Sequence, residues 1–146
     1  MAIDYQNWEN TVPEAIKADS LWKMTAYRRA LYLTDQCWQD TQTLLKDRHS
    51  APIADQLYRA VGSVSANLAE GYSRMSAKDR ALFYQYALGS TREARDWYFK
   101  ARHTLGDLVF SQRMEVLTEI LRLLIKMIPQ QRGYLVREDS ELYQTS

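Results

Sequence analysis

Apolar residues recur at steps of three and four over four long segments of the chain, which is the spacing of one face of an α-helix. The segments cover about residues 20–46, 51–71, 77–105 and 112–128. No stretch alternates apolar and polar residues for long enough to predict a β-strand. The pattern therefore predicts an all-α protein.

The connections between these segments are short, and each carries a residue that starts or ends a helix. Pro52 lies in the first turn of the second helix, where its missing N–H costs no hydrogen bond. Ser76 and Asp79 form a shortened capping box before the third helix. Gly106 is expected to end the third helix, and Pro129 and Gly133 the fourth. Short connections favour antiparallel neighbours, so the sequence predicts an up-down-up-down four-helix bundle.

We expect this bundle to occupy residues 20–133. Residues 1–19 precede it as an arm with one short turn, and residues 134–146 follow it as a frayed acidic tail. The expected inward stripe of the first helix consists of Tyr27, Leu31, Thr34, Trp38, Thr41 and Leu45. The expected inward stripe of the third helix consists of Phe83, Ala87, Ser90, Ala94, Trp97 and Ala101.

The third and fourth helices carry more apolar surface than the core of one bundle needs. Apolar residues cover roughly 200° of the fourth helix, whereas an outer helix of a monomer needs a stripe only somewhat wider than about 100°. Surplus faces predict self-association, and most homo-oligomers are symmetric. The alternative is that the arm, with Tyr5 and Trp8, folds back over one face. The candidate interface residues are Leu88, Phe99, Val116, Ile120, Leu123 and Met127.

Charge is unevenly distributed along the chain, although the net charge is only +1. Residues 1–19 and 134–146 together hold two basic and seven acidic residues, whereas residues 20–133 hold 17 basic and 11 acidic residues. A basic body attracts polyanions, and its acidic ends compete for the same surface. The alternative is ordinary solubilising charge.

Several classes of protein are disfavoured by the composition. Cys37 is the only cysteine, which excludes an internal disulfide and a cysteine-based metal site. The two histidines are far apart, so we expect no metal ion and no cofactor. Glu119, Arg122 and Lys126 interrupt the most apolar stretch, so no membrane span is expected. No secretory signal is visible, and we expect a cytoplasmic protein.

The third helix carries a row of arginine and tyrosine residues at helical spacing. Arginine forks bind phosphate oxygens and tyrosine rings stack on bases, so the row predicts a nucleic-acid interface. The alternative is a solvated face on which the arginines pair with acids such as Glu70, Glu93 and Asp96. The candidate nucleic-acid-binding residues, with neighbouring positions included, are Arg59, Arg74, Lys78, Arg80, Tyr84, Arg92, Arg95, Tyr98 and Arg102.

No catalytic constellation is visible. His49 is predicted in a loop and His103 on a polar helix face, and neither has an evident nucleophile or metal partner. Ser90 is read as a core serine that bonds its own helix. The chain carries no phosphate-binding loop, dinucleotide fingerprint or zinc-protease motif. We therefore expect no catalytic residues and no enzymatic activity.

Two blocks of the sequence resemble a known family. The first is QLYRAVGSVSANLAEG at residues 56–71, and the second is ALGS at residues 87–90, with Phe83 before it and Glu93 after it. They look like the motifs of bacterial four-helix-bundle proteins encoded in intervening sequences of 23S rRNA genes, sometimes labelled S23 ribosomal proteins. The similarity extends over roughly residues 27–128.

The resemblance implies a bundle that assembles as a homopentameric ring. It also implies kinship with the accessory variability protein of diversity-generating retroelements, a basic pentameric barrel that engages a reverse transcriptase and nucleic acid. The chain departs from the family pattern at Tyr58, where a further basic residue is frequent, and at Ser65, where proline is frequent.

The motif residues also have a physical interpretation. Gly71 and Gly89 have no side chain, so we expect the second and third helices to approach closely there. Asn67, Glu70 and Glu93 are expected to form a polar network that sets the register of the helices. The structural motif residues are Asn67, Glu70, Gly71, Gly89, Ser90 and Glu93.

These patterns predict a non-enzymatic homo-oligomer that binds RNA or DNA through a basic helical face. The alternative is a scaffold that recruits a protein, such as a polymerase or reverse transcriptase, without touching nucleic acid. A small ligand in a central channel is a third hypothesis.

Overall fold

The computed structural model describes the backbone of residues 3–144 and the side chains of residues 3–133. Every regular element in this range is helical, which confirms the all-α prediction. The elements are α1 (Tyr5–Glu9), α2 (Glu14–Lys17), the 3-10 helix η1 (Ser20–Lys23), α3 (Thr25–Leu45), α4 (Ala51–Tyr72), α5 (Ala77–Leu105) and α6 (Asp107–Gln144).

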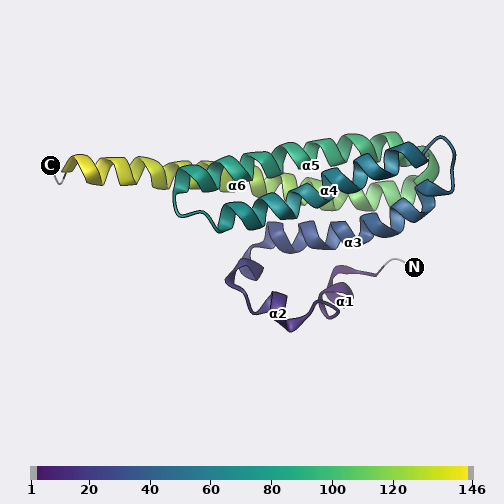
Figure 1. Ribbon diagram of the computed structural model, residues 1–146, viewed down its shortest axis with the longest axis horizontal. Helices are drawn as coiled ribbons and strands as arrows, with labels where there is room; N and C mark the ends of the chain where they lie inside the picture. The colour runs from purple at the N-terminus through teal and green to yellow at the C-terminus, as the bar shows by residue number, and fades with distance from the viewer. Residues whose placement is uncertain (1–2, 145–146) are drawn as a thin grey trace.

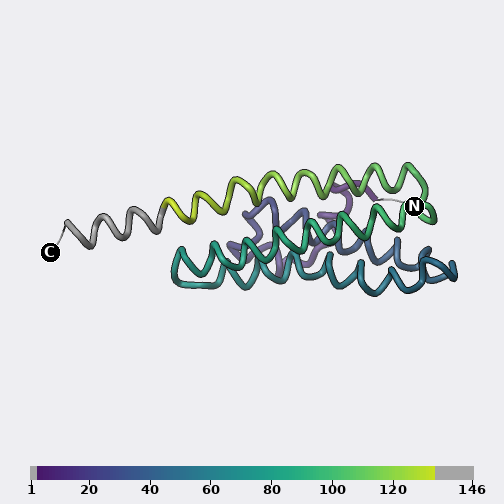
Figure 2. Tube along the Cα trace, turned by 90° about the horizontal axis from the view of Figure 1, so that it is seen from above, coloured from purple at the N-terminus to yellow at the C-terminus, as the bar shows by residue number. Residues whose placement is uncertain are grey.

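The long helices α3 to α6 pack side by side as a helical bundle (Figure 1, Figure 2). α4 packs between α3 and α5, and α6 packs against both α5 and α3. Successive helices run in opposite directions (Figure 1). The largest aliphatic side chains of the core are fully buried: Leu33, Leu44, Leu57, Val61, Val64, Leu68, Leu117, Ile120 and Leu124.

Most helix ends lie where local signals place them. Pro52 is in the first turn of α4, and the Ser76 hydroxyl accepts a hydrogen bond from the Asp79 N–H at 3.1 Å. Gly106 ends α5 with a φ of 88°, a conformation that favours glycine. These three predictions are confirmed because each depends on interactions within a few residues of the chain.

The fourth predicted helix is longer than expected at both ends. α6 begins at Asp107, directly after Gly106, and it continues through Pro129 to Gln144. Pro129 removes the hydrogen bond to the carbonyl of Ile125, four residues earlier. Ile125 is 49% exposed, so water reaches this turn of the helix. The prediction that Pro129 and Gly133 end the helix is therefore wrong.

The core faces of α3 and α5 are rotated from the predicted stripes. On α3, Trp38 and Leu45 are 53% and 58% exposed, while small residues such as Ala30 and Cys37 face the core. Small side chains let α3 approach its neighbours closely, and the bulky Trp38 lies outside, against Tyr58 of α4. On α5, three residues expected to point inward are only half-buried: Phe83, Ser90 and Trp97.

The N-terminal arm folds back against α3 (Figure 1). Trp8 is 6% exposed, and its Nε1 donates a hydrogen bond to Asp35 Oδ2 at 2.7 Å. The Tyr32 hydroxyl donates to the carbonyl oxygen of Ile3 at 2.9 Å, and Ile3 and Val116 of α6 line the same pocket. The arm therefore packs on α3, next to α6.

The arm helps to form a cavity of about 650 Å³ between itself, α3 and the start of α6. Trp8, Asp35 and Trp38 line this cavity, together with Arg113. The hydrogen bond from Trp8 to Asp35 joins two of its walls, so its shape depends on the docked arm. Across the helices that the structure describes, none combines the length and apolarity of a membrane span.

Candidate nucleic-acid interface

Both tyrosines predicted to stack on bases lie in the core. Tyr84 is 3% exposed and Tyr98 is fully buried, and the Tyr98 hydroxyl donates a hydrogen bond to Asp40 Oδ2 at 2.7 Å. The other core positions of α5 include alanines such as Ala87 and Ala94, so the two rings fill the space that small side chains leave. The interpretation of Tyr84 and Tyr98 as base-stacking residues is therefore wrong.

Three of the predicted arginines remain on one outward side of α5. Arg92, Arg95 and Arg102 are spaced by three and seven residues, which places them on one helix flank. Leu88 and Phe99 fall on the same flank, and Phe99 contacts Phe110 of α6, so this flank faces α6. We call this surface the arginine flank. It consists of Leu88, Arg92, Arg95, Phe99 and Arg102.

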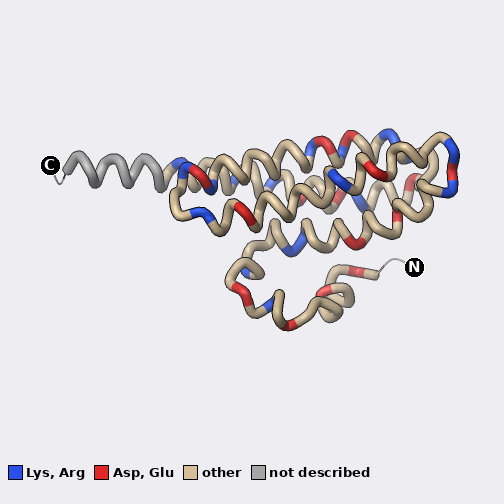
Figure 3. The backbone as a smooth tube through the Cα atoms, viewed as in Figure 1, with Lys and Arg blue, Asp and Glu red and all other residues tan. Residues whose placement is uncertain are grey.

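The charges of the arginine flank have no ion-pair partner among residues 3–133. Among the described side chains, none of its three arginines forms an ion pair. Asp96, the acid next to Arg95, pairs instead with Lys100 at 2.7 Å. Basic and acidic positions are interspersed along α5 (Figure 3), so the pairing of individual residues decides where positive charge remains available.

Two further candidates pair with acidic residues of α4 that lie four residues earlier. Arg59 Nε lies 3.3 Å from Asp55 Oδ2, and Arg74, just after the end of α4, pairs with Glu70. Exposed pairs of this kind are each worth a few tenths of a kcal/mol. The alternative interpretation, in which arginines pair with nearby acids, therefore holds for Arg59 and Arg74.

Lys78 and Arg80 lie in the first turn of α5, next to its connection with α4 and away from the middle of α5. Arg80 Nε donates to Gln131 Oε1 at 2.9 Å, and its Nη1 donates to the carbonyl oxygens of Arg74 and Met75. Lys78 is exposed. Arg80 thus holds the turn against α6, which is a structural role, and the predicted basic region is divided between this turn and the arginine flank.

The two motif glycines have different surroundings. A Cβ added at Gly71 would lie 2.8 Å from Phe83 Cβ and 2.9 Å from Tyr84 Cε1, so α4 and α5 meet closely there. A Cβ added at Gly89 would have no atom within 4 Å, and Gly89 is exposed. The expectation of a close approach is right for Gly71 and wrong for Gly89.

The expected polar network of the motif is not formed among the described residues. The Asn67 Nδ2 donates to the carbonyl oxygen of Ser63 at 2.8 Å, within its own helix. Glu70 pairs with Arg74, and Glu93 is exposed on α5. Among the described residues, no hydrogen bond or ion pair made by these three side chains links α4 to α5.

The candidate interface residues do not form one surface. Ile120 is fully buried within its own bundle, so it is unavailable to a second copy, and this prediction is wrong. Val116, Leu123 and Met127 are half-buried and pack against the core. Leu88 packs against the core in the same way, and Phe99 is 51% exposed. Leu88 and Phe99 belong to the arginine flank, so two predicted surfaces coincide there.

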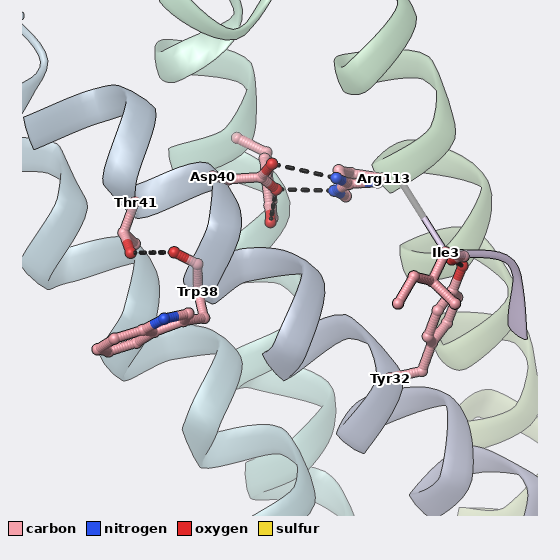
Figure 4. Close-up of polar contacts among 7 residues, drawn as sticks. Ile3, Tyr32, Trp38, Asp40, Thr41 and Arg113 are labelled. Carbon is pink, nitrogen blue, oxygen red and sulfur yellow. Dashed lines mark hydrogen bonds and ion pairs between the residues drawn. The ribbon is translucent and has the colours of Figure 1, made fainter. Parts of the chain in front are cut away.

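A buried ion pair that the sequence patterns did not reveal joins α3 to α6. Asp40 Oδ2 accepts a hydrogen bond from Arg113 Nε at 2.7 Å, and Asp40 Oδ1 accepts one from Arg113 Nη2 at 3.1 Å (Figure 4). The two residues are 5% and 4% exposed. Tyr98 adds a third bond to Asp40, so the cluster links α3, α5 and α6. No local signal predicts this pairing, because the partners are 73 residues apart.

Burial and this cluster shift several pKa values. Burial raises the pKa of Tyr98 well above 10, and the neighbouring Cys37 and Asp40 raise it further. Burial alone would lower the pKa of Arg113, but the hydrogen bonds and charge of Asp40 outweigh it, so the pKa is raised. Burial also raises the pKa of Cys37 to about 12, which keeps the thiol protonated. No cluster of potential metal ligands is found in the part of the chain with described side chains.

The fold and the surface define a small helical-bundle protein with an unpaired arginine surface and a buried interhelical ion pair. The family model of the 23S rRNA-intervening sequence protein matches residues 23–130, and the chain belongs to this family. The arm, residues 1–19, lies entirely outside the matched residues. A comparison with curated proteins gave no match.

A solved structure shows the same fold. It is the crystal structure of a protein with unknown function from the S23 ribosomal protein family of Bacteroides thetaiotaomicron, with a TM-score of 0.67 and 21% sequence identity. The similarity covers 71% of this chain and 98% of the Bacteroides chain. The resemblance that the two sequence blocks indicated is therefore confirmed at the level of family and fold.

Proposed function

We propose that this protein is a non-enzymatic, cytoplasmic homo-oligomer that binds RNA or DNA through the arginine flank of α5. The observation that carries the proposal is the set of three guanidinium groups on one helix side, none of them in an ion pair among the described residues. Guanidinium groups bind phosphate oxygens bidentately, and their own acids would compete for the same donors. The relation to rRNA intervening sequences in the family's name is consistent with a nucleic-acid partner.

Self-association is the second part of the proposal. Ile125 is 49% exposed and Leu108 is 74% exposed, both on α6. They lie 17 residues apart in the sequence, so they are two separate exposed apolar positions on this helix. The resemblance to the family implies that four packed helices form one subunit of a pentameric ring, and we adopt this arrangement for the proposal.

The nucleic-acid contact is tested by reversing charge on the flank. Replacing Arg95 and Arg102 together by Glu should abolish the shift of structured RNA in low-salt gels, because two phosphate contacts become repulsive. The matched control is Arg59→Glu on α4, since Arg59 already pairs with Asp55 and lies off the flank. Binding by the double variant that equals binding by the control would reject the arginine flank as the site.

The oligomer is tested by light scattering on the same preparations. A mass near five chains, unchanged in the charge-reversed variant, is the expected result, because the three arginines lie on α5 and the exposed Ile125 and Leu108 lie on α6. A stable monomer at micromolar concentration would contradict self-association and leave the nucleic-acid contact to be judged on the gels.

A scaffold function has one specific observation in its favour. Trp38 and Tyr58 form an exposed aromatic pair between α3 and α4, with ring centroids 5.8 Å apart and exposures of 53% and 38%. Exposed tryptophan and tyrosine are enriched at protein interfaces. Failure of the wild-type protein to shift RNA, together with loss of a specific co-purifying protein in Trp38→Ala, would favour this function over the first.

A further inference from the structure

The arginine flank contains an aromatic ring, Phe99, that the sequence patterns assigned to the oligomer interface. We call Phe99, together with the Arg102 guanidinium over it, the platform. The ring of Phe99 is half-exposed and touches Phe110 edge-on, with centroids 6.2 Å apart and an interplanar angle of 64°. The guanidinium of Arg102 lies over the Phe99 ring, with Cζ 3.8 Å from the ring centroid. Arg102 Nη1 also donates to the Phe99 carbonyl oxygen at 2.8 Å, which holds the guanidinium in place.

The platform lies inside the row of unpaired arginines. Arg95 is one helical turn before Phe99, and Arg92 is about one further turn away, so the row from Arg92 to Arg102 spans about 15 Å along α5. Residues 92–102 carry four basic and two acidic residues, and one of these acids is already paired with Lys100. Phosphate groups and an aromatic partner can therefore bind to one continuous strip.

The facing side of α6 adds no acid to the middle of this strip. The positions that follow Phe110 on the same helix side, at steps of four and three residues, are uncharged. Along the length of the strip they are Met114, Thr118 and Leu121. The strip is thus positive and aromatic from its α5 side and uncharged from its α6 side.

We propose that the nucleic acid bound by this flank is single-stranded, with one unpaired base stacked on the platform that Phe99 and Arg102 form. Arg92 and Arg95 then bind the phosphates of the same strand. This inference rests on the function proposed above and specifies its ligand. In a duplex both faces of each base are covered by its neighbours, so only a single strand, loop or bulge offers a free base face to an aromatic ring or a guanidinium plane.

A second copy of the chain is a poorer occupant of the same platform. A copy seated on Phe99 would also cover the guanidinium groups of Arg95 and Arg102. Removing unpaired charges from water is costly unless carboxylates meet them. A phosphate backbone supplies that negative charge at every nucleotide. Phe99, which the sequence placed in the candidate oligomer interface, therefore belongs to the nucleic-acid site in this proposal.

The test compares one sequence in two forms. The ligands are a fluorescein-labelled, unstructured RNA of about twenty nucleotides and the duplex of the same sequence, titrated in low salt with the full chain. Wild type should bind the single strand more tightly than the duplex. Phe99→Ala should weaken single-strand binding by roughly five- to 150-fold, the range for loss of one base stack. It should leave duplex binding nearly unchanged.

Three variants serve as controls. Phe99→Leu keeps the apolar bulk but has no π face, so it should weaken single-strand binding as Phe99→Ala does. Because Leu fills the space of the ring, this variant separates loss of stacking from a folding defect. Tyr86→Ala removes an equally exposed ring from another side of α5 and should have no effect. Arg102→Lys keeps the charge but not the planar guanidinium, and it should weaken single-strand binding more than Arg92→Lys does.

Each other result overturns the inference in a distinguishable way. Equal binding of both RNA forms, with Phe99→Ala unaffected, would show a site that reads phosphates only, and the proposed function would stand. A change of oligomer mass in Phe99→Ala with unchanged RNA affinity would assign the ring to the interface between copies. No binding of either RNA by wild type would remove the proposed function and this inference together.

Discussion

The buried cluster of Asp40, Tyr98 and Arg113 allows a quantitative test of what holds the bundle in register. Asp40 accepts three hydrogen bonds, from Tyr98 Oη at 2.7 Å, Arg113 Nε at 2.7 Å and Arg113 Nη2 at 3.1 Å. Asp40→Asn removes the negative charge and turns one acceptor into a donor that faces other donors. The Arg113 guanidinium, 4% exposed, is then left as an uncompensated buried charge.

The expected cost of Asp40→Asn is about 3–5 kcal/mol of unfolding free energy, the range for removing one partner of a buried ion pair. Tyr98→Phe removes only one bond to the carboxylate and should cost about 1.5–3 kcal/mol. The triple variant Asp40→Leu, Tyr98→Phe, Arg113→Met removes all polar groups at once. It should lie within about 1 kcal/mol of wild type or above it, because no buried charge is left unpaired.

The measurement is urea unfolding followed by far-ultraviolet circular dichroism, at one fixed protein concentration so that any self-association contributes equally. The slope of free energy against urea should stay constant across the series, which would show that each variant exposes a similar amount of additional surface when it unfolds. A cost below about 1 kcal/mol for Asp40→Asn, or a triple variant less stable than Asp40→Asn, would refute the reasoning.

Two further predictions concern substitutions at single positions. Gly71→Ala should lower the free energy of unfolding by about 1–3 kcal/mol, because the new Cβ would collide with Phe83 and Tyr84. Gly89→Ala should raise it by about 0.5–1 kcal/mol, because the Cβ has open space and the backbone is helical. Thermal unfolding compares the two variants, and equal midpoints would contradict both predictions. Cys37 should not react with a thiol reagent at about pH 8 until the protein is unfolded. Folding raises the pKa of Cys37 from 9.0 to about 12, so the folded state binds more protons than the unfolded state between these values, and stability should fall as pH rises from 9.0 to about 12. Cys37→Ala should make this fall less steep, and an unchanged slope would contradict the prediction.

The sequence by itself determined the helical class, the helix starts at Pro52 and Ser76, and the end at Gly106. These features depend on periodicity and on capping groups within one helical turn, and both are visible in the sequence. The motif of residues 56–71 likewise identified the family, because its residues follow one another along a single helix.

The tertiary structure alone decided which face of each helix is buried. On α5, apolar and aromatic residues occur all around the helix, so spacing could not tell Tyr84 and Tyr98, which fill space beside alanines, from Phe99, which remains half-exposed. The bond from Asp40 to Arg113 joins residues 73 positions apart, and only the packing of α3 against α6 brings them together. The local pattern of residues determines where helices begin and end. Which side chains are buried depends on the volume and charge of segments that are distant in the sequence and pack together in the fold.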